Sequence, residues 1–381
     1  MSEPLRVLVI EDSALDAKVL IGLLSAGGYE VTSDRVETAA EFSGALDAAE
    51  WDVVLADYNL PEFNGQEALE LLQQSGRDIP FIMISGGIGE DLAVQIMKAG
   101  AHDYLMKGNL ARLVPAVERE VREARERTRH REAEAALHAA NEQMRIAREI
   151  QQRLFPKEAP ALKGFELAGL TESAEQTGGD YYDFVPMPEG RIGLVVGDVT
   201  GHGIGPALLM AETRAYLRIL SEEDADVGRI LTLANRVLSG DIDPERFVTL
   251  LFIMLDPETR EIRYASAGHP PGLWLNRNGR LKEELRRTGL PLGIRPDTEY
   301  TMSEPMTLKR GDLLAIMTDG VEEAMAANQE LFGEERIIET LAEHQSEPPA
   351  QIVAKLHEAG RAFGVGDAQG DDFTTIVLKA K

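Results

Sequence analysis

The first third of the chain alternates short apolar runs with segments of helical periodicity. The apolar runs cover residues 5–10, 29–32, 51–56, 79–84 and 102–106, and helical patterns lie at 15–24, 36–48, 64–74 and 90–99. Repeated strand–helix units predict a parallel sheet with helices on both of its faces. We therefore expect a doubly wound, five-stranded α/β domain over residues 1–112.

A change of composition predicts a helical linker over residues 113–156, where Arg, Glu and Ala dominate and glycine is absent. Heptad-like steps connect positions 117, 121, 124 and 128, and a second run out of register with the first connects 133, 137, 140, 144, 147, 151 and 154. This pattern favours two short coiled-coil segments joined by a discontinuity. We expect a dimerising helix that Phe155-Pro156 ends. The alternative is a solvated helix packed on its own domain.

Residues 157–381 predict a different architecture. Strand patterns lie at 166–170, 181–186, 192–198, 249–256, 261–267, 273–276, 312–318 and 374–378, and helical patterns at 205–220, 228–238, 334–343 and 349–363. Turn sequences such as Asn278-Gly279 favour antiparallel pairing. We expect an α+β sandwich of two antiparallel sheets flanked by helices.

Charge and composition restrict the metal ligands and the partners that this chain can have. The chain has no cysteine, so any metal site must use oxygen or imidazole ligands, and oxygen-only sites favour Mg²⁺ or Mn²⁺. A net charge of −26 argues against nucleic acid as a partner. No apolar run approaches the roughly 20 residues of a membrane-spanning helix, and the first residues do not match a signal peptide. We expect a cytoplasmic protein without a membrane partner.

Polar residues follow the strands predicted in the first domain. Glu11 and Asp12 end the first strand, and Asp57, Ser85 and Lys107 end the third, fourth and fifth. In a parallel sheet these ends meet at one edge, where ligands bind. Carboxylates there can hold a hard cation, and one of them can attack a phosphoryl group. The lysine would neutralise the transferring oxygens, and the serine hydroxyl would hydrogen-bond the bound phosphoryl group.

This segment resembles a response-regulator receiver domain over about residues 5–125. The motifs are Val-Ile-Glu-Asp-Ser (9–13), Ala-Asp-Tyr-Asn-Leu-Pro (56–61), Met-Ile-Ser-Gly (83–86) and Asp-Tyr-Leu-Met-Lys-Gly (103–108). The resemblance implies that a sensor histidine kinase phosphorylates Asp57. It also implies an Mg²⁺ site made by Glu11, Asp12, Asp57 and the Asn59 carbonyl, with Ser85 and Lys107 contacting the phosphoryl group and Tyr104 reporting it.

Four motifs in the last region place aspartates beside glycines, at residues 177–183, 196–203, 317–323 and 370–374. Two hard cations bridged by one carboxylate need about this many acidic ligands. A single Asp-Gly pair often forms an ordinary turn, so the prediction of a metal site depends on the four motifs occurring together. We expect Asp183 and Glu322 to be supporting or surface residues. His202 and His269 lie in glycine-flanked turns, where a structural role is at least as good an explanation as catalysis.

These motifs resemble the metal-dependent PPM phosphatases (type 2C), most closely their bacterial SpoIIE/RsbU-type branch, over about residues 150–381. The resemblance implies two Mn²⁺ or Mg²⁺ ions, with Asp198 as the bridging ligand and the Val199 carbonyl completing one site. Asp180, Asp319 and Asp371 match the remaining carboxylates, although Asp372 could exchange roles with Asp371. Residues 147–156 resemble the segment that leads into the switch helices of this branch.

Together these features predict a phosphatase for phosphoserine or phosphothreonine proteins that is controlled by phosphorylation of Asp57. The resemblance suggests an anti-anti-sigma-type partner as the substrate, and the sign of the control stays open. The alternative is a scaffold that binds its partner through a phosphatase-like fold without turnover. A DNA-binding response regulator fits poorly, because no basic recognition helix is present.

Overall fold

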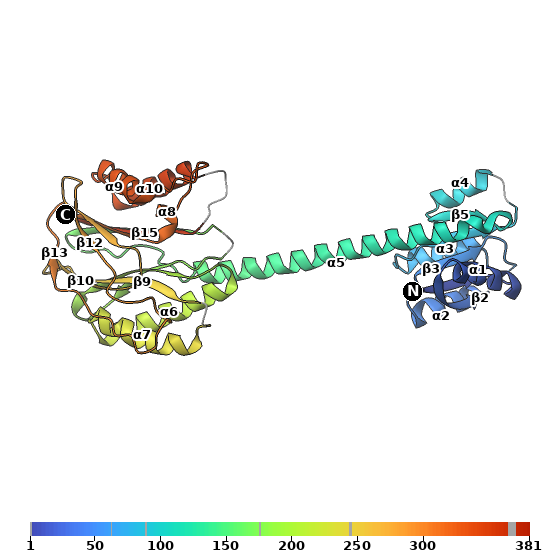
Figure 1. Ribbon diagram of the computed structural model, residues 1–381, viewed down its shortest axis with the longest axis horizontal. Coiled ribbons are helices and arrows are strands. Elements are labelled where there is room, and N and C mark those ends of the chain that lie inside the picture. Colours follow the sequence, from blue (N-terminus) through green and yellow to red (C-terminus); the bar gives the residue numbers. More distant parts are fainter. Residues whose placement is uncertain (1, 62, 88–89, 175–176, 244–245, 365–370) are drawn as a thin grey trace. The chain divides into compact units, whose positions relative to one another are not determined.

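The computed structural model describes residues 2–61, 63–87, 90–174, 177–243, 246–364 and 371–381 (Figure 1). It divides into two compact units, Met1–His138 and Ala139–Lys381, which are described separately below. The division falls inside the predicted linker. The finer domain boundaries at 112 and 156 stay a prediction.

The first unit is the predicted doubly wound domain. Its sheet has the order β2-β1-β3-β4-β5, and every pairing is parallel. The strands are β1 (Glu3–Ile10), β2 (Tyr29–Val36), β3 (Val53–Asp57), β4 (Phe81–Ser85) and β5 (Asp103–Met106). The helices between them are α1 (Ala14–Ala26), α2 (Ala39–Ala48), α3 (Gly65–Gln74) and α4 (Glu90–Lys98).

Alternation along β1 fills a core on each face of the sheet. Leu8 and Ile10 pack with Phe42 of α2, whereas Val7 and Val9 pack on the opposite face with residues of α1. Local sequence fixes where the helices begin. The Ser13 and Thr38 side chains cap α1 and α2, and Asn64, which reads as a loop residue in the sequence, caps α3.

Helix α5 (Leu113–Gln152) is one continuous helix of 40 residues that follows a 3₁₀ segment, η1 (Lys107–Arg112). The helix therefore runs without a break through the predicted shift in heptad register. Val117, Val121 and Ala124 are buried within the first unit. The first apolar run therefore reflects packing of the helix on the sheet of that unit. Leu137, in the second run, is 63% exposed. The shift in register marks the point where the helix leaves that core.

The second unit contains two antiparallel sheets, as expected. One has the order β13 (Met306–Thr307), β10 (Glu261–Ala267), β9 (Val248–Asp256), β8 (Ile192–Val199), β7 (Tyr181–Pro186). The other has the order β12 (Leu281–Leu285), β11 (Gly272–Leu275), β14 (Leu313–Met317), β15 (Phe373–Ala380), β6 (Phe165–Glu172). The sequence pattern did not predict the short strands β12 and β13.

Helices cover both outer faces of this sandwich. The core between the sheets joins residues such as Leu194 and Ile253 of one sheet to Ile316 and Ile376 of the other. Helices α6 (Ile204–Glu223) and α7 (Val227–Asp241) cover the first sheet. On the second sheet lie α8 (Asp319–Glu322), α9 (Gly333–Glu343) and α10 (Pro349–Phe363) (Figure 1). A short 3₁₀ turn, η2 (Pro188–Gly190), joins β7 to β8.

Within the described residues, no helix combines the length and the apolar character that crossing a membrane requires.

Candidate functional sites

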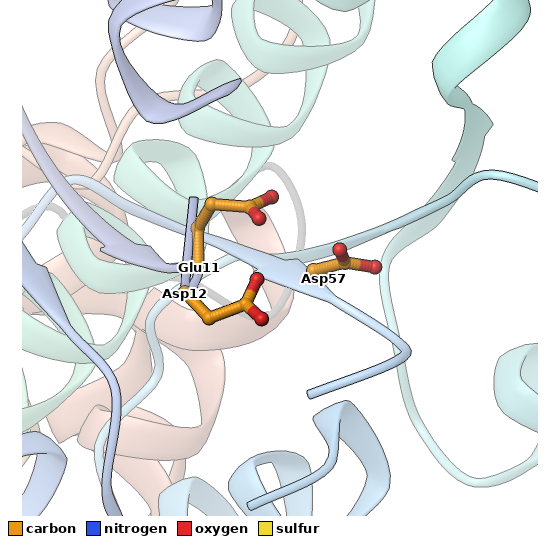
Figure 2. A group of neighbouring side chains, drawn as sticks. All are labelled: Glu11, Asp12 and Asp57. Carbon is orange, nitrogen blue, oxygen red and sulfur yellow. The ribbon is translucent and has the colours of Figure 1, made fainter. Parts of the chain in front are cut away.

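The carboxyl edge of the parallel sheet gathers three acidic side chains, as predicted. Glu11 and Asp12 follow β1, and Asp57 ends β3 (Figure 2). One oxygen from each carboxylate lies within 4.8 Å of the others. Glu11 and Asp57 are buried, and burial is the main cause that raises the pKa of Glu11. A close set of hard oxygen donors has the chemistry that Mg²⁺ requires.

Lys107 connects the acidic residues of this edge. Its Nζ lies 2.9 Å from Glu11 Oε2, 2.8 Å from Asp57 Oδ2 and 2.6 Å from Asp16 Oδ2. Burial alone would lower the pKa of Lys107, but the hydrogen bonds to Asp16, Asp57 and Glu11 outweigh it and raise that pKa above its usual range. Asp16, in the first turn of α1, was not predicted. Asp16 reaches Lys107 because α1 begins directly after Ser13 and places Asp16 in its first turn.

The remaining predicted receiver residues lie at the same edge. The Asn59 N–H donates to Asp57 Oδ1 at 3.1 Å, so the chain folds back over this carboxylate. Ser85 follows Ile84, which pairs with Asp57 across the sheet. The Ser85 hydroxyl and the Tyr104 hydroxyl are both buried, and neither has a hydrogen-bond partner within the described residues. Ser85, the last residue of β4, therefore has a hydroxyl available for a ligand at this edge, whereas Tyr104 lies two residues before the end of β5.

The second unit brings the aspartates of four separate motifs together. Asp198 lies near the end of β8, and Asp180 precedes Tyr181, which pairs with Gly197. Asp319 begins α8 directly after β14, and Asp371 and Asp372 precede β15, which pairs with β14. The ends of both sheets thus meet here, and the five aspartates come from the four sequence motifs. Among the described residues, its oxygens are less tightly clustered than the receiver trio.

The charges of these aspartates act on one another. Burial, followed by the charges of Asp319, Asp371 and Asp372, raises the pKa of Asp198 to about 7. Burial and the Asp198 charge raise the pKa of Asp180 well above its usual range. Carboxylates that are buried together without a nearby cation repel one another, and divalent cations relieve that repulsion. The donor set, which is oxygen only, fits such ions.

The structure separates the two adjacent aspartates of the last motif. Asp372 is buried, and its Oδ1 accepts a hydrogen bond of 2.8 Å from the Ala174 N–H. Its carboxylate also fills the space that a side chain at position 178 would need, which explains Gly178. Asp371 is exposed, and after burial its charge is one of the causes that raise the pKa values of Asp198 and Asp319. This geometry favours Asp371 as the ligand and Asp372 as an anchor for the 178–180 loop.

Thr318 is a site residue that sequence reasoning missed. Its hydroxyl donates to Asp180 Oδ2 at 2.8 Å and accepts from the Thr374 N–H at 3.2 Å. It therefore orients Asp180 while joining β14 to β15. The available signal was its place directly before Asp319 in the third motif. Gly179 has a comparable positional role, because a side chain there would collide with the Val199 carbonyl.

Asp183 lies inside the fold, three residues after Asp180. It is completely buried, and Arg218 of α6 binds it through two hydrogen bonds of 2.6 Å. The Tyr181 hydroxyl donates a further bond of 2.9 Å. Asp183 is therefore not a surface residue, and it joins β7 to α6.

The histidines named above differ in their surroundings. His269 is buried, and its Nδ1 lies 2.9 Å from the Thr249 hydroxyl. Burial lowers the pKa of His269 to about 3, so its ring is neutral near pH 7. This agrees with a structural role. His202 is exposed in the turn before α6.

Comparison with known proteins matches both units. Residues 188–381 match the family model of stage II sporulation protein E (SpoIIE), and residues 7–118 match the response regulator receiver domain. Phosphoserine phosphatase RsbU of Bacillus subtilis is 30% identical over 240 residues, which are 63% of this chain and 70% of RsbU.

Solved structures agree on the fold. The RsbU and RsbW domains of Rv1364c from Mycobacterium tuberculosis align with a TM-score of 0.51 at 25% identity, over 58% of this chain and 61% of that one. The SiaA-PP2C domain of Pseudomonas aeruginosa aligns with a TM-score of 0.57 at 19% identity, over 65% and 98%. The chain therefore belongs to the SpoIIE family of PPM-type phosphatases and carries a response-regulator receiver domain before its SpoIIE domain.

Proposed function

We propose that this chain is a metal-dependent protein serine/threonine phosphatase whose activity the receiver controls. The observation that carries the proposal is the convergence of Asp180, Asp319, Asp371 and Asp372, from three distant motifs, on Asp198 in a fourth. The similarity to RsbU, a phosphoserine phosphatase, supports the same activity.

In this proposal two Mn²⁺ or Mg²⁺ ions are held by Asp180, Asp198, the Val199 carbonyl, Asp319 and Asp371. Bound ions of this kind lower the pKa of a water molecule and hold a phosphate ester for in-line attack. The protein keeps the ligands in place. Thr318 orients Asp180, and Asp372 anchors the loop that carries it.

Turnover of p-nitrophenyl phosphate and of a phosphoserine peptide with Mn²⁺ tests this activity. Asp198→Asn should lower the rate by about a hundredfold or more, because it removes the carboxylate shared by both ions. Asp241→Asn, at an exposed aspartate of the same unit, is the matched control. Full Mn²⁺-dependent activity of Asp198→Asn would exclude the catalytic assignment. Partner binding by a wild-type protein without turnover would favour the scaffold alternative.

For the receiver we propose phosphorylation of Asp57 by a sensor histidine kinase, which would place the chain in the cytoplasm. Glu11, Asp12, Asp57 and the Asn59 carbonyl would hold Mg²⁺, and Lys107, Ser85 and Tyr104 would respond to the phosphoryl group. The buried hydroxyl groups of Ser85 and Tyr104 support this assignment. Acetyl phosphate should modify the wild-type protein and not Asp57→Asn, as followed by intact mass. Equal labelling of both proteins would refute it.

The proposed substrate is a phosphoserine or phosphothreonine protein of the anti-anti-sigma type, and the proposed assembly is a homodimer through α5. Turnover of such a phosphoprotein, measured with and without acetyl phosphate while the mass in solution is followed, tests both points. The same comparison gives the sign of the control, because the rate either rises or falls on receiver phosphorylation.

A further inference from the structure

The start of α6 carries an exposed apolar face beside the aspartate site. Ile204 is 38% exposed and Leu208 is 66% exposed, and their spacing of four residues puts them on one face of the helix. The Gly203 N–H directly before this helix donates to the Thr177 carbonyl at 3.4 Å. This apolar face is therefore continuous with the loop that carries Asp180.

Arg246 lies against the same helix turn. Its guanidinium occupies the space that a side chain at Gly205 would need. The backbone next to it is fixed, because the Thr200 N–H donates to the Phe247 carbonyl at 3.1 Å. Within the described residues, the Arg246 side chain has no hydrogen-bond or ion-pair partner, whereas Arg218 of α6 is bound to Asp183.

A second loop extends this surface. Leu292 and Val248 exchange two backbone hydrogen bonds, of 2.8 and 3.0 Å, so the 292–294 segment runs beside Arg246. A side chain at Gly293 would approach the Arg246 carbonyl. The following residue, Ile294, is 45% exposed. An unpaired cation with exposed apolar side chains on two sides thus lies beside a strongly acidic site.

The strand register shows where Arg246 lies relative to the proposed catalytic aspartates. Asp198 pairs with Thr249, and Arg246 lies three residues before Thr249, just ahead of β9. Its guanidinium lies against Gly205 at the start of α6, so it points toward the surface beside Asp198, where residues that flank the phosphorylated one would lie. A free guanidinium in a chain of net charge −26 would favour an acidic flanking side chain.

We propose that Arg246, Ile204, Leu208 and Ile294 form a docking surface for the phosphoprotein substrate. Arg246 binds an acidic residue near the phosphorylated serine or threonine, and the apolar side chains bind aliphatic neighbours of that residue. The proposal rests on the proposed phosphatase function and adds the class of sequence that the site selects.

Three probes test the surface on the full chain with Mn²⁺. They are p-nitrophenyl phosphate, a phosphoserine peptide flanked by glutamate and leucine, and a phosphoserine peptide flanked by glycine and serine. Arg246→Ala should raise KM for the acidic, apolar peptide by about five- to tenfold, the loss expected for one charge-assisted contact. Its kcat, and both other probes, should stay within about twofold of wild type. Leu208→Ser should act in the same direction.

Arg236→Ala, at an exposed arginine of α7, is the matched control and should change none of the three probes. An equal loss on all three probes with Arg246→Ala would place Arg246 in the metal site and overturn the docking surface. No change on the acidic, apolar peptide would overturn it as well. If the wild-type protein turned over none of the probes, the phosphatase function itself would fall, so the two failures are distinguishable.

Discussion

Gln151 holds Gly178 through both backbone groups of that glycine. The Gln151 Nε2 donates to the Gly178 carbonyl at 2.6 Å, and the Gly178 N–H donates to Gln151 Oε1 at 3.3 Å. Gln151 is only 5% exposed although it lies near the end of α5. Gly178 lies two residues before Asp180. The helix that leaves the receiver core therefore ends on the loop that carries a proposed metal ligand.

Loss of this amide should weaken catalysis more than it weakens the fold. Gln151→Ala leaves the Gly178 N–H and carbonyl without their partner, which costs about 1–3 kcal/mol. Because the freed loop carries Asp180, we expect kcat/KM for p-nitrophenyl phosphate to fall at least tenfold and the Mn²⁺ requirement to rise. A Mn²⁺ titration of activity measures both effects.

Gln152→Ala is the control, since Gln152 is the exposed neighbour on the same helix turn. It should leave the titration unchanged. Equal behaviour of the two variants would show that α5 does not support the Asp180 loop.

Asp371→Asn and Asp372→Asn should have different effects. Asp371→Asn removes a proposed ligand, so it should raise the Mn²⁺ concentration for half-maximal activity by about tenfold or more while the melting temperature stays near that of wild type. Asp372→Asn weakens the bond to the Ala174 N–H and should lower the melting temperature more than Asp371→Asn does. Thermal unfolding and Mn²⁺ titration of both variants decide the assignment, and the reverse pattern would exchange the two roles.

Local sequence was sufficient for much of the fold and for predicting which acidic side chains the fold brings close together. Strand ends in a parallel sheet meet at one edge, so Glu11, Asp57 and Lys107 could be grouped before their distances were known. Asp16 and Thr318 escaped prediction because neither is an acidic residue at a strand end: Asp16 lies in the first turn of α1, and Thr318 is not acidic. The choice between Asp371 and Asp372 depended on which carboxylate meets the Ala174 N–H, and no spacing rule contains that information.

In the linker, the sequence pattern was not enough to predict what the apolar residues contact. Apolar steps along α5 look alike whether they face a sheet or another helix, so a heptad pattern could not separate Val117 from Leu137. Only burial distinguishes them, because Val117 is fully buried and Leu137 is 63% exposed.

Mg²⁺ should partly replace the stabilising charge of Lys107 in a variant that lacks this lysine. Lys107→Met leaves Glu11, Asp16 and Asp57 without their shared cation, and losing one partner of a mostly buried ion pair costs about 3 kcal/mol or more. We expect the receiver to melt at a lower temperature and Mg²⁺ to raise that temperature more in the variant than in wild type. Lys98→Met, at the exposed end of α4, should show neither change. A variant insensitive to Mg²⁺ would contradict the proposed cation site.

Leu137 should contribute to the proposed dimer. A glutamate at this position would place charges against one another in a parallel pair of helices. We expect Leu137→Glu to shift the protein toward the monomer mass in light scattering, with receiver phosphorylation by acetyl phosphate retained. Ala136→Glu, one residue away on another face of the helix, should leave the mass unchanged. A wild-type protein that is monomeric at all concentrations would rule the interface out.

His357 should make the SpoIIE domain sensitive to acid. The ring is fully buried with Nε2 3.0 Å from the Thr375 hydroxyl, and burial lowers its pKa to about 4. The unfolded chain binds a proton near pH 6.5, so between pH 6.5 and 4 the unfolded state takes up a proton that the folded state does not. Folding stability should thus be unaffected by this group above pH 6.5 and fall by roughly 3 kcal/mol as the pH reaches 4. His357→Gln keeps a polar side chain without this titration, so its melting temperature should depend less on pH across that range. Parallel curves for variant and wild type would show that His357 does not set the acid sensitivity.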